Sequence, residues 1–223
     1  MTCVGINHKD MQLVKTHHES GRGIHAKSVV VNPKEHLKEA EEMVAWFEEK
    51  NGHFEGENER AYAIAHCQVT DSETPMKLIV LDRQLVKPDA DREGKMSLTN
   101  AYFEAQCIWN AEILEKPRKV TIQAPERRVE KGDKKGEVKV DVVMVDREVE
   151  NTYSVMEGCM SYPHRKGKRM VRNHRIKVRY QYLTKTLGIT HTKTFEGWVE
   201  GLKAHILQHE VEHFDGKTMY FRS

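Results

Sequence analysis

Two histidines and a glutamate form a pattern near the C-terminal end, where residues 208–213 read Gln-His-Glu-Val-Glu-His. Residues four apart lie on the same face of an α-helix, so His209 and His213 can bind one metal ion. Glu210 lies between them, where its carboxylate can reach a water bound to that ion. Because few residues follow His213, we expect a third protein ligand to come from upstream.

A second motif lies upstream, where residues 157–163 read Glu-Gly-Cys-Met-Ser-Tyr-Pro. In combination with the histidine motif, it resembles the peptide deformylase family. The resemblance covers residues from about 32 to 223, with the charged segment 116–152 as an insertion. The further segments that resemble family patterns are residues 61–68, 77–82, 108–114, 170–172 and 214–217.

The resemblance implies a metal centre with one ion per chain, held by Cys159, His209 and His213. Such a set leaves a fourth position open, which is typical of a catalytic rather than a structural metal. In the family the ion is usually Fe²⁺, and Zn²⁺ or Ni²⁺ can substitute. The required thiolate is available, because the four cysteines lack the spacing of a disulfide scaffold and are predicted to be reduced.

The resemblance also implies a reaction, the removal of the formyl group from formyl-methionyl peptides. A metal-bound water acts as the nucleophile near neutral pH. Glu210 takes its proton as general base and later passes one to the leaving amine as general acid. The side-chain amide of Gln68 and the backbone N–H of Met160 are expected to stabilise the tetrahedral oxyanion.

The substrate-binding residues that the resemblance implies lie on several segments. Arg172 is expected to hold the peptide backbone or its carboxylate end. His205 is expected to make the methionine pocket narrower and more polar than is usual in the family, and Glu212 stands where the family has an aspartate. The pocket and its approach are expected to comprise Tyr62, Ala63, Leu202, His205 and Ile206.

Two other hypotheses remain open. The first is a metal-dependent amidase or peptidase of the same fold with a different substrate, which His66, His205 and the insertion favour. The second is a noncatalytic relative that binds a metal or a partner, which the replacement of glycines by Ala61 and Ala63 favours. Glu210 argues against the second hypothesis, since a binding module has no need of a general base.

The secondary structure that must position these residues is predicted from periodicity and breakers. Asn32 and Pro33 precede a helix expected over 34–50. Strands are expected at 77–82, 107–109 and 175–182, with a turn at 185–190 and a return strand at 191–195. A long β-ribbon is expected within the charged insertion at about 116–152, and the last helix from about 195 to 214. We therefore predict an α+β fold, mainly antiparallel strands packed around a central, buried helix that carries the HExxH motif.

The bulk composition fits a single catalytic domain over residues 1–223. The chain is 38% hydrophobic and 31% charged, with a formal net charge of +2. This charge gives no reason to expect specific nucleic-acid or membrane binding, and no segment is long and apolar enough for a membrane span. The N-terminus lacks the pattern of a secretory signal. We therefore expect a cytoplasmic enzyme that acts on formylated nascent peptides and contacts the ribosome at most transiently.

Overall fold

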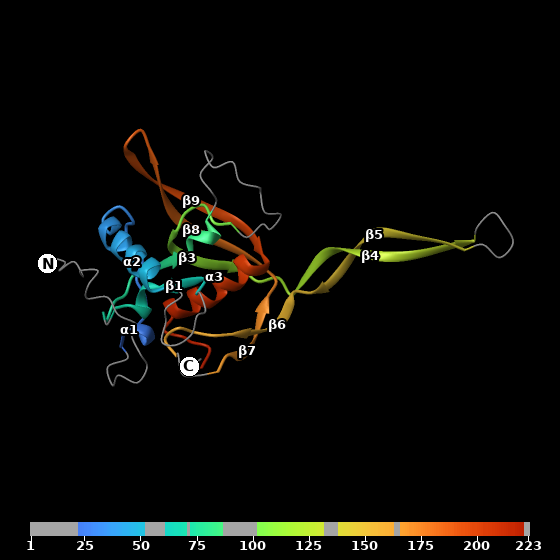
Figure 1. Cartoon of the computed structure of the whole chain (residues 1–223), viewed down its shortest axis with the longest axis horizontal. Coiled ribbons are helices and arrows are strands. Elements are labelled where there is room, and N and C mark those ends of the chain that lie inside the picture. Colours follow the sequence, from blue (N-terminus) through green and yellow to red (C-terminus); the bar gives the residue numbers. More distant parts are fainter. Residues whose placement is uncertain are drawn as a thin grey trace.

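Five strands form the main sheet, and each strand runs antiparallel to its neighbours in the order β1-β2-β3-β8-β9. The computed structural model describes residues 22–51, 61–70, 72–86, 102–131, 138–162 and 166–220. Figure 1 shows the sheet at the centre of the chain, with helices beside it. The strand bounds are β1 Ala63–Ala65, β2 Leu78–Leu81, β3 Cys107–Glu115, β8 Arg175–Thr186 and β9 Ile189–Glu200.

Strand β2 is buried on both faces, which explains its uninterrupted apolar sequence. Successive side chains of a strand point to opposite faces of the sheet. Ile79 and Leu81 join a core cluster with residues of helix α3 (Gly201–Phe214). Leu78 and Val80 join a second cluster with residues of helix α2 (Leu37–Lys50). The sheet is therefore packed between these two helices.

Two smaller antiparallel hairpins complete the strands. The ribbon of β4 (Lys119–Lys131) and β5 (Val138–Glu150) projects away from the sheet (Figure 1). The hairpin of β6 (Thr152–Glu157) and β7 (Lys168–Asn173) lies beside α3. Three short elements remain: helix α1 (Arg22–His25) and the 3-10 helices His66–Gln68 and Arg83–Leu85. No helix among the described residues is long and apolar enough to cross a membrane.

The prediction of an α+β fold with mainly antiparallel strands is confirmed, but two helix boundaries are wrong. The last helix begins at Gly201 rather than near residue 195, because β9 continues to Glu200 and Gly201 turns the chain with a φ of 57°. The other helix begins at Leu37 rather than Lys34. The side-chain oxygen of Asn32 accepts the backbone N–H of Lys34 at 3.2 Å, which stabilises a turn before the helix.

The predicted strands are present; most are shorter than those observed, whereas the strand expected at 77–82 narrows to Leu78–Leu81. Strand β3 continues to Glu115 rather than ending at 109, and passes through Asn110, whose φ of 52° coincides with an irregularity in the pairing with β8. The turn expected over 185–190 narrows to Leu187 and Gly188, so β8 and β9 each have 12 residues. The ribbon of β4 and β5 pairs from Lys119 and Glu150 at its base to Lys131 and Val138, within the insertion expected at about 116–152.

Gly216 is predicted to be intolerant of a side chain. Its φ is 71°, and a Cβ there would lie 2.3 Å from the backbone oxygen of His25. Gly188 is the matched control, because its φ is 79° and a Cβ would contact nothing within 4 Å. We expect Gly188→Ala to cost roughly 1–2 kcal/mol for the left-handed conformation alone. Gly216→Ala should cost more in denaturant unfolding, and equal losses would contradict the close approach.

Candidate metal centre

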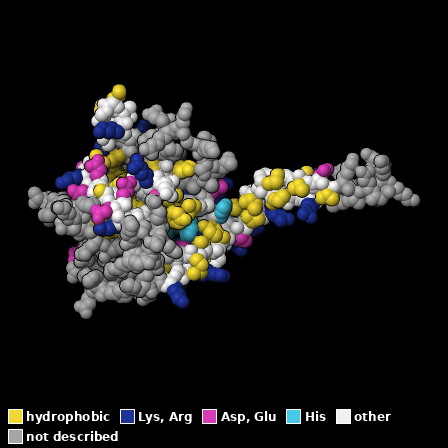
Figure 2. Space-filling view, viewed as in Figure 1, with side chains coloured by type: hydrophobic (Ala, Val, Ile, Leu, Met, Phe, Trp, Pro, Cys, Tyr) yellow, Lys and Arg dark blue, Asp and Glu magenta, His cyan; other side chains and the backbone are white. Residues whose placement is uncertain are grey.

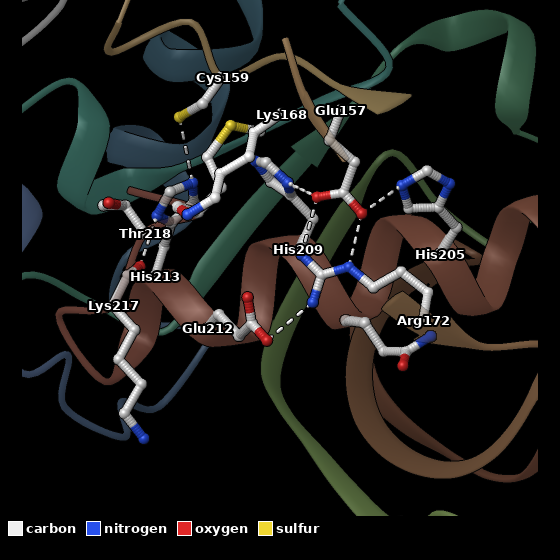
Figure 3. Close-up of polar contacts among 12 residues, drawn as sticks. Glu157, Cys159, Lys168, Arg172, His205, His209, Glu212, His213, Lys217 and Thr218 are labelled. Carbon is white, nitrogen blue, oxygen red and sulfur yellow. Dashed lines mark hydrogen bonds and ion pairs between the residues drawn. The ribbon is translucent and has the colours of Figure 1, made fainter. Parts of the chain in front are cut away.

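Three potential metal ligands meet between α3 and the loop after β6. Cys159 lies two residues beyond the end of β6, while His209 and His213 lie one turn apart on α3. One ligand atom from each of the three residues lies within 4.8 Å of the other two. The structure thus brings together the three residues that the sequence predicts, from positions about 50 residues apart in the chain (Figure 3).

Each of the two histidines forms a hydrogen bond through Nδ1, which leaves Nε2 of each ring available to bind a metal. Nδ1 of His213 donates to the backbone oxygen of Lys217 at 3.1 Å, and Nδ1 of His209 donates to Glu157 Oε2 at 2.9 Å. Nε2 of His213 lies 3.6 Å from Cys159 Sγ. Hydrogen bonding of one imidazole nitrogen to a carboxylate or a carbonyl is typical of metal-binding histidines, since it orients the ring and increases its basicity.

Burial controls the charge of these imidazoles. Desolvation holds the pKa of His213 well below its ordinary value, and the neighbouring His209 lowers it further. Desolvation opposes protonation of His209 as well, but hydrogen bonds to Cys159 and Glu157 raise the pKa of His209 well above its ordinary value. The groups that stabilise a proton on His209 are a thiol and a carboxylate, and these groups also stabilise a metal cation.

Glu157 connects the metal ligands with the rest of the fold. Its carboxylate accepts hydrogen bonds from Arg172 Nε at 2.5 Å and Arg172 Nη2 at 2.7 Å. His205 Nε2 lies 2.8 Å from Glu157 Oε1. Burial alone would raise the pKa of Glu157, but the bonds to Arg172, His205 and His209 hold that pKa well below its ordinary value. Glu157 is therefore a buried anion that orients His209 (Figure 3).

Arg172 has a structural role that competes with the substrate-binding role expected from sequence. Its guanidinium is buried and forms a two-point contact with Glu157. A third hydrogen bond runs from Nη1 to Glu212 Oε1 at 2.7 Å, so a second carboxylate contacts the same guanidinium. These contacts with two carboxylates make Arg172 a positioning residue for Glu157, while its contact with substrate stays a prediction.

Glu210 follows His209 directly on α3. It is buried, and desolvation raises its pKa to about 7. Its Oε2 atom has no hydrogen-bond partner within the described part of the chain. A buried carboxylate oxygen without a partner is costly, and a water held at the neighbouring ligands would supply one. The soft thiolate, two imidazoles and this unpaired oxygen together fit a metal with an accessible position.

Gln68 is oriented toward the ligands by its own side-chain oxygen. Gln68 Oε1 accepts the backbone N–H of Ala65 at 2.8 Å, which turns the amide nitrogen the other way. Nε2 then lies 3.7 Å from Cys159 Sγ and donates to Ser161 Oγ at 3.2 Å. Met160, half-buried, follows the cysteine in the chain. The two expected oxyanion donors therefore flank Cys159 in space and in sequence.

The expected pocket residues lie on β1 and on α3. Tyr62 is exposed and Ala63 is buried at the start of β1, while Leu202 is half-buried and Ile206 is buried on the helix. His205 lies between the latter two in sequence and contacts Glu157 and the edge of Tyr153, with ring centroids 6.3 Å apart. His205 thus links the expected pocket to the carboxylate that orients His209.

His66 has a structural contact that sequence reasoning missed. Its Nδ1 accepts the backbone N–H of Met76 at 3.1 Å, which leaves Nε2 to donate to Glu39 Oε1 at 3.2 Å. This connects the 3-10 helix that contains Gln68 with α2. Because both ring nitrogens make these structural contacts, His66 gives little support to an altered substrate.

The role of Glu157 was also missed, although its position two residues before the cysteine was a usable signal.

Comparisons with known proteins identify the family and the fold of the chain. A family model described as polypeptide deformylase matches residues 76–223. A peptide deformylase from Ehrlichia chaffeensis is similar in structure, with a TM-score of 0.52 and 18% identity over 95% of this chain and 87% of that one. A class I type b peptide deformylase from Acinetobacter baumannii gives a TM-score of 0.51 and 20% identity over 94% and 97%. A probable peptide deformylase from synechococcus phage S-SSM7 gives a TM-score of 0.50 and 16% identity, over 94% of this chain and 97% of that one. No curated protein matches the chain in sequence.

Loss of the Glu157 charge is predicted to weaken metal binding. Glu157→Gln keeps the size of the side chain but replaces one acceptor oxygen with a donor, so His209 loses its anionic partner. We expect metal affinity, measured by competition with a chromophoric chelator, to fall about 10- to 100-fold. Glu115→Gln, at an exposed ion pair with Lys177, is the control. An unchanged affinity in folded Glu157→Gln protein would contradict the orienting role.

The metal-free protein is predicted to lose stability as pH rises, through Glu210. Burial raises the pKa of Glu210 from an ordinary 4.5 to about 7 in the folded state. The folded state therefore holds this proton more tightly than the unfolded chain, and the associated stability is present below about pH 4.5 and lost as pH rises through 7. Relative to wild type, Glu210→Gln should gain on the order of 2 kcal/mol in urea unfolding between pH 5 and pH 8. Parallel curves for the two proteins would contradict the shift.

Proposed function

This chain belongs to the polypeptide deformylase family, and on that premise we propose that it hydrolyses the N-terminal formyl group of formyl-methionyl peptides. The observation that carries the proposal is the convergence of Cys159, His209 and His213, together with a buried, unpaired oxygen of Glu210 on the helix that carries the two histidines. A purely structural metal site has no use for that carboxylate. Gln68, with its amide nitrogen beside the cysteine, supports the same proposal.

Cys159, His209 and His213 hold one metal ion per chain in this proposal, and we expect that ion to be Fe²⁺. A thiolate with two imidazoles is also compatible with Zn²⁺ or Ni²⁺. When bound, the metal supplies Lewis acidity and a water of lowered pKa. Glu157 keeps His209 in the orientation and tautomer that binding requires.

Glu210 moves the proton. With a pKa of about 7, its carboxylate accepts a proton from the attacking water near neutral pH and returns one to the departing amine nitrogen. The burial that raises this pKa also keeps bulk water from competing for the proton. Glu210 therefore acts as general base in the first half of the reaction and as general acid in the second.

Gln68 and Met160 stabilise the negative charge that develops on the formyl oxygen. The amide of Gln68 is held by the backbone of Ala65, so it is oriented before the substrate arrives. Such preorganised donors contribute more than flexible ones, because no reorganisation is needed as the charge forms. The backbone N–H of Met160 is the second donor in this proposal.

The position of His205 among the proposed pocket residues favours a second candidate, a metal-dependent amidase or peptidase of the same fold with a different substrate. Tyr62, Ala63, Leu202 and Ile206 supply the remaining, mostly apolar walls of the proposed pocket. An imidazole among them narrows the pocket and offers a polar atom. Formyl peptides that differ only in their first residue separate the two candidates.

We treat residues 1–223 as one catalytic domain around the HExxH helix, with the ribbon at 116–152 as an insertion. The proposed substrates are formylated nascent peptides in the cytoplasm, reached with at most a transient ribosome contact. The formal charge of +2 supports the absence of a specific nucleic-acid partner.

Formate release from formyl-Met-Ala-Ser is the test of the proposed function, using protein loaded with Fe²⁺ under anaerobic conditions. Replacing the proton-transfer group with an amide, in Glu210→Gln, is expected to lower kcat by roughly 10²- to 10⁴-fold with metal content unchanged. Glu196→Gln, at an exposed position on β9, is the control. Turnover by metal-loaded Glu210→Gln at the wild-type rate would contradict the mechanism. Hydrolysis of acetylated rather than formylated peptides by wild type would favour the related amidase.

A further inference from the structure

The β4–β5 ribbon carries an unpaired edge on each side. Within the described part of the chain, β4 and β5 pair only with each other, over 13 residues each. The ribbon projects from the sheet, and apolar side chains lie along it in the space-filling view (Figure 2). A long edge of this kind is a template for pairing with another strand unless it is blocked.

The direction of the backbone groups along β5 follows from two independent observations. The N–H of Asn151 donates to the backbone oxygen of Arg118 at 2.8 Å, which makes this a hydrogen-bonded pair at the base of the ribbon. Hydrogen-bonded and non-hydrogen-bonded pairs alternate in an antiparallel ladder. Counting along the register, Met144 falls in a non-hydrogen-bonded pair with Pro125. Proline requires that position, because it has no N–H to donate to its partner strand.

The outward backbone groups of β5 therefore belong to Val140, Val142, Met144 and Asp146. The first three side chains share one face of the ribbon and are 56%, 63% and 59% exposed. Strand β4 is blunted by Pro125 at the same level, whereas β5 has no proline and no register shift. The edge of β5 thus offers unpaired hydrogen-bonding groups and apolar side chains at the same residues.

We propose that the edge of β5 pairs with β5 of a second copy of this chain. The two strands run antiparallel around a two-fold axis at Val142, which joins two ribbons into a four-stranded sheet. In this register Val142 lies opposite its own copy and Val140 lies opposite Met144 of the other chain. The outward N–H and C=O groups then pair with each other, and a two-fold contact closes at two copies.

The charge pattern of β5 selects this register over its neighbours. A two-fold axis at Asp141 would place two carboxylates directly opposite each other, which is destabilising. An axis at Val143 would keep Val142 opposite Met144, but it would place Val140 opposite Asp146 and the like-charged positions 139 and 147 opposite each other. The axis at Val142 places Asp141 opposite Val143, so no like charges face each other between residues 140 and 144. A second copy of the chain can therefore supply hydrogen-bond partners for the outward N–H and C=O groups of β5.

Sedimentation velocity of the full-length chain tests the proposal. Because the interface is small and of the weak class, we expect the wild type to shift from monomer to dimer as its concentration reaches roughly 100 µM. Val142→Lys introduces two ammonium groups at the two-fold axis and should weaken association at least tenfold. Ile189→Lys is the matched control, since Ile189 is similarly exposed, at 61%, in the β8–β9 hairpin.

A second variant, Val142→Pro, tests the backbone contacts. It removes an outward N–H, as Pro125 already does on β4, and should abolish the dimer while the hairpin remains paired. Circular dichroism and formate release verify that each variant is folded, since the ribbon lies outside the catalytic residues. A wild-type monomer at every concentration would overturn the proposal. A dimer that Val142→Lys and Val142→Pro both leave intact would overturn it too, because the interface would lie elsewhere.

Discussion

The buried carboxylate of Glu157 is the contact on which the metal centre depends. Burial of a charge costs several kcal/mol unless it is well paired, and here both oxygens are occupied. Arg172 binds them at two points, and His205 and His209 contact one oxygen each. The groups come from β6, β7 and α3, so one anion joins three elements. Its position also determines which nitrogen of His209 can bind a metal.

The sheet supports this arrangement from the other side of α3. Helix α3 packs through Ala204, Leu207 and Phe214 on the face of the sheet that carries Ile79 and Leu81, with α2 on the opposite face. The same helix turns His209 and His213 toward Cys159 in the loop after β6 and also carries Glu210. A helix buried in this way holds its polar residues in fixed positions, and desolvation then raises the pKa of Glu210. The burial of α3 therefore both fixes the positions of its polar side chains and raises the pKa of Glu210.

Sequence patterns predicted the parts of this molecule that depend on local spacing. The interval of four between His209 and His213 requires only a helix, and the alternation in β8 requires only a half-buried strand. The roles of Glu157 and Arg172 depend on how the β6–β7 hairpin lies against α3, which no local pattern encodes. The start of α3 was misplaced because the apolar residues before Gly201 suit a strand or a helix equally. The contact of His66 with Glu39 is not visible in the local sequence, because the two residues are 27 positions apart.

The central claim is that one thiolate and two imidazoles bind a single metal ion with a position left open. X-ray absorption at the zinc edge of zinc-loaded protein tests it most directly. The account predicts one sulfur at about 2.3 Å and two imidazole nitrogens at about 2.0–2.1 Å. The sulfur contribution should disappear in Cys159→Ser. A zinc site without sulfur in the wild type, or one whose sulfur persists in Cys159→Ser, would contradict the account.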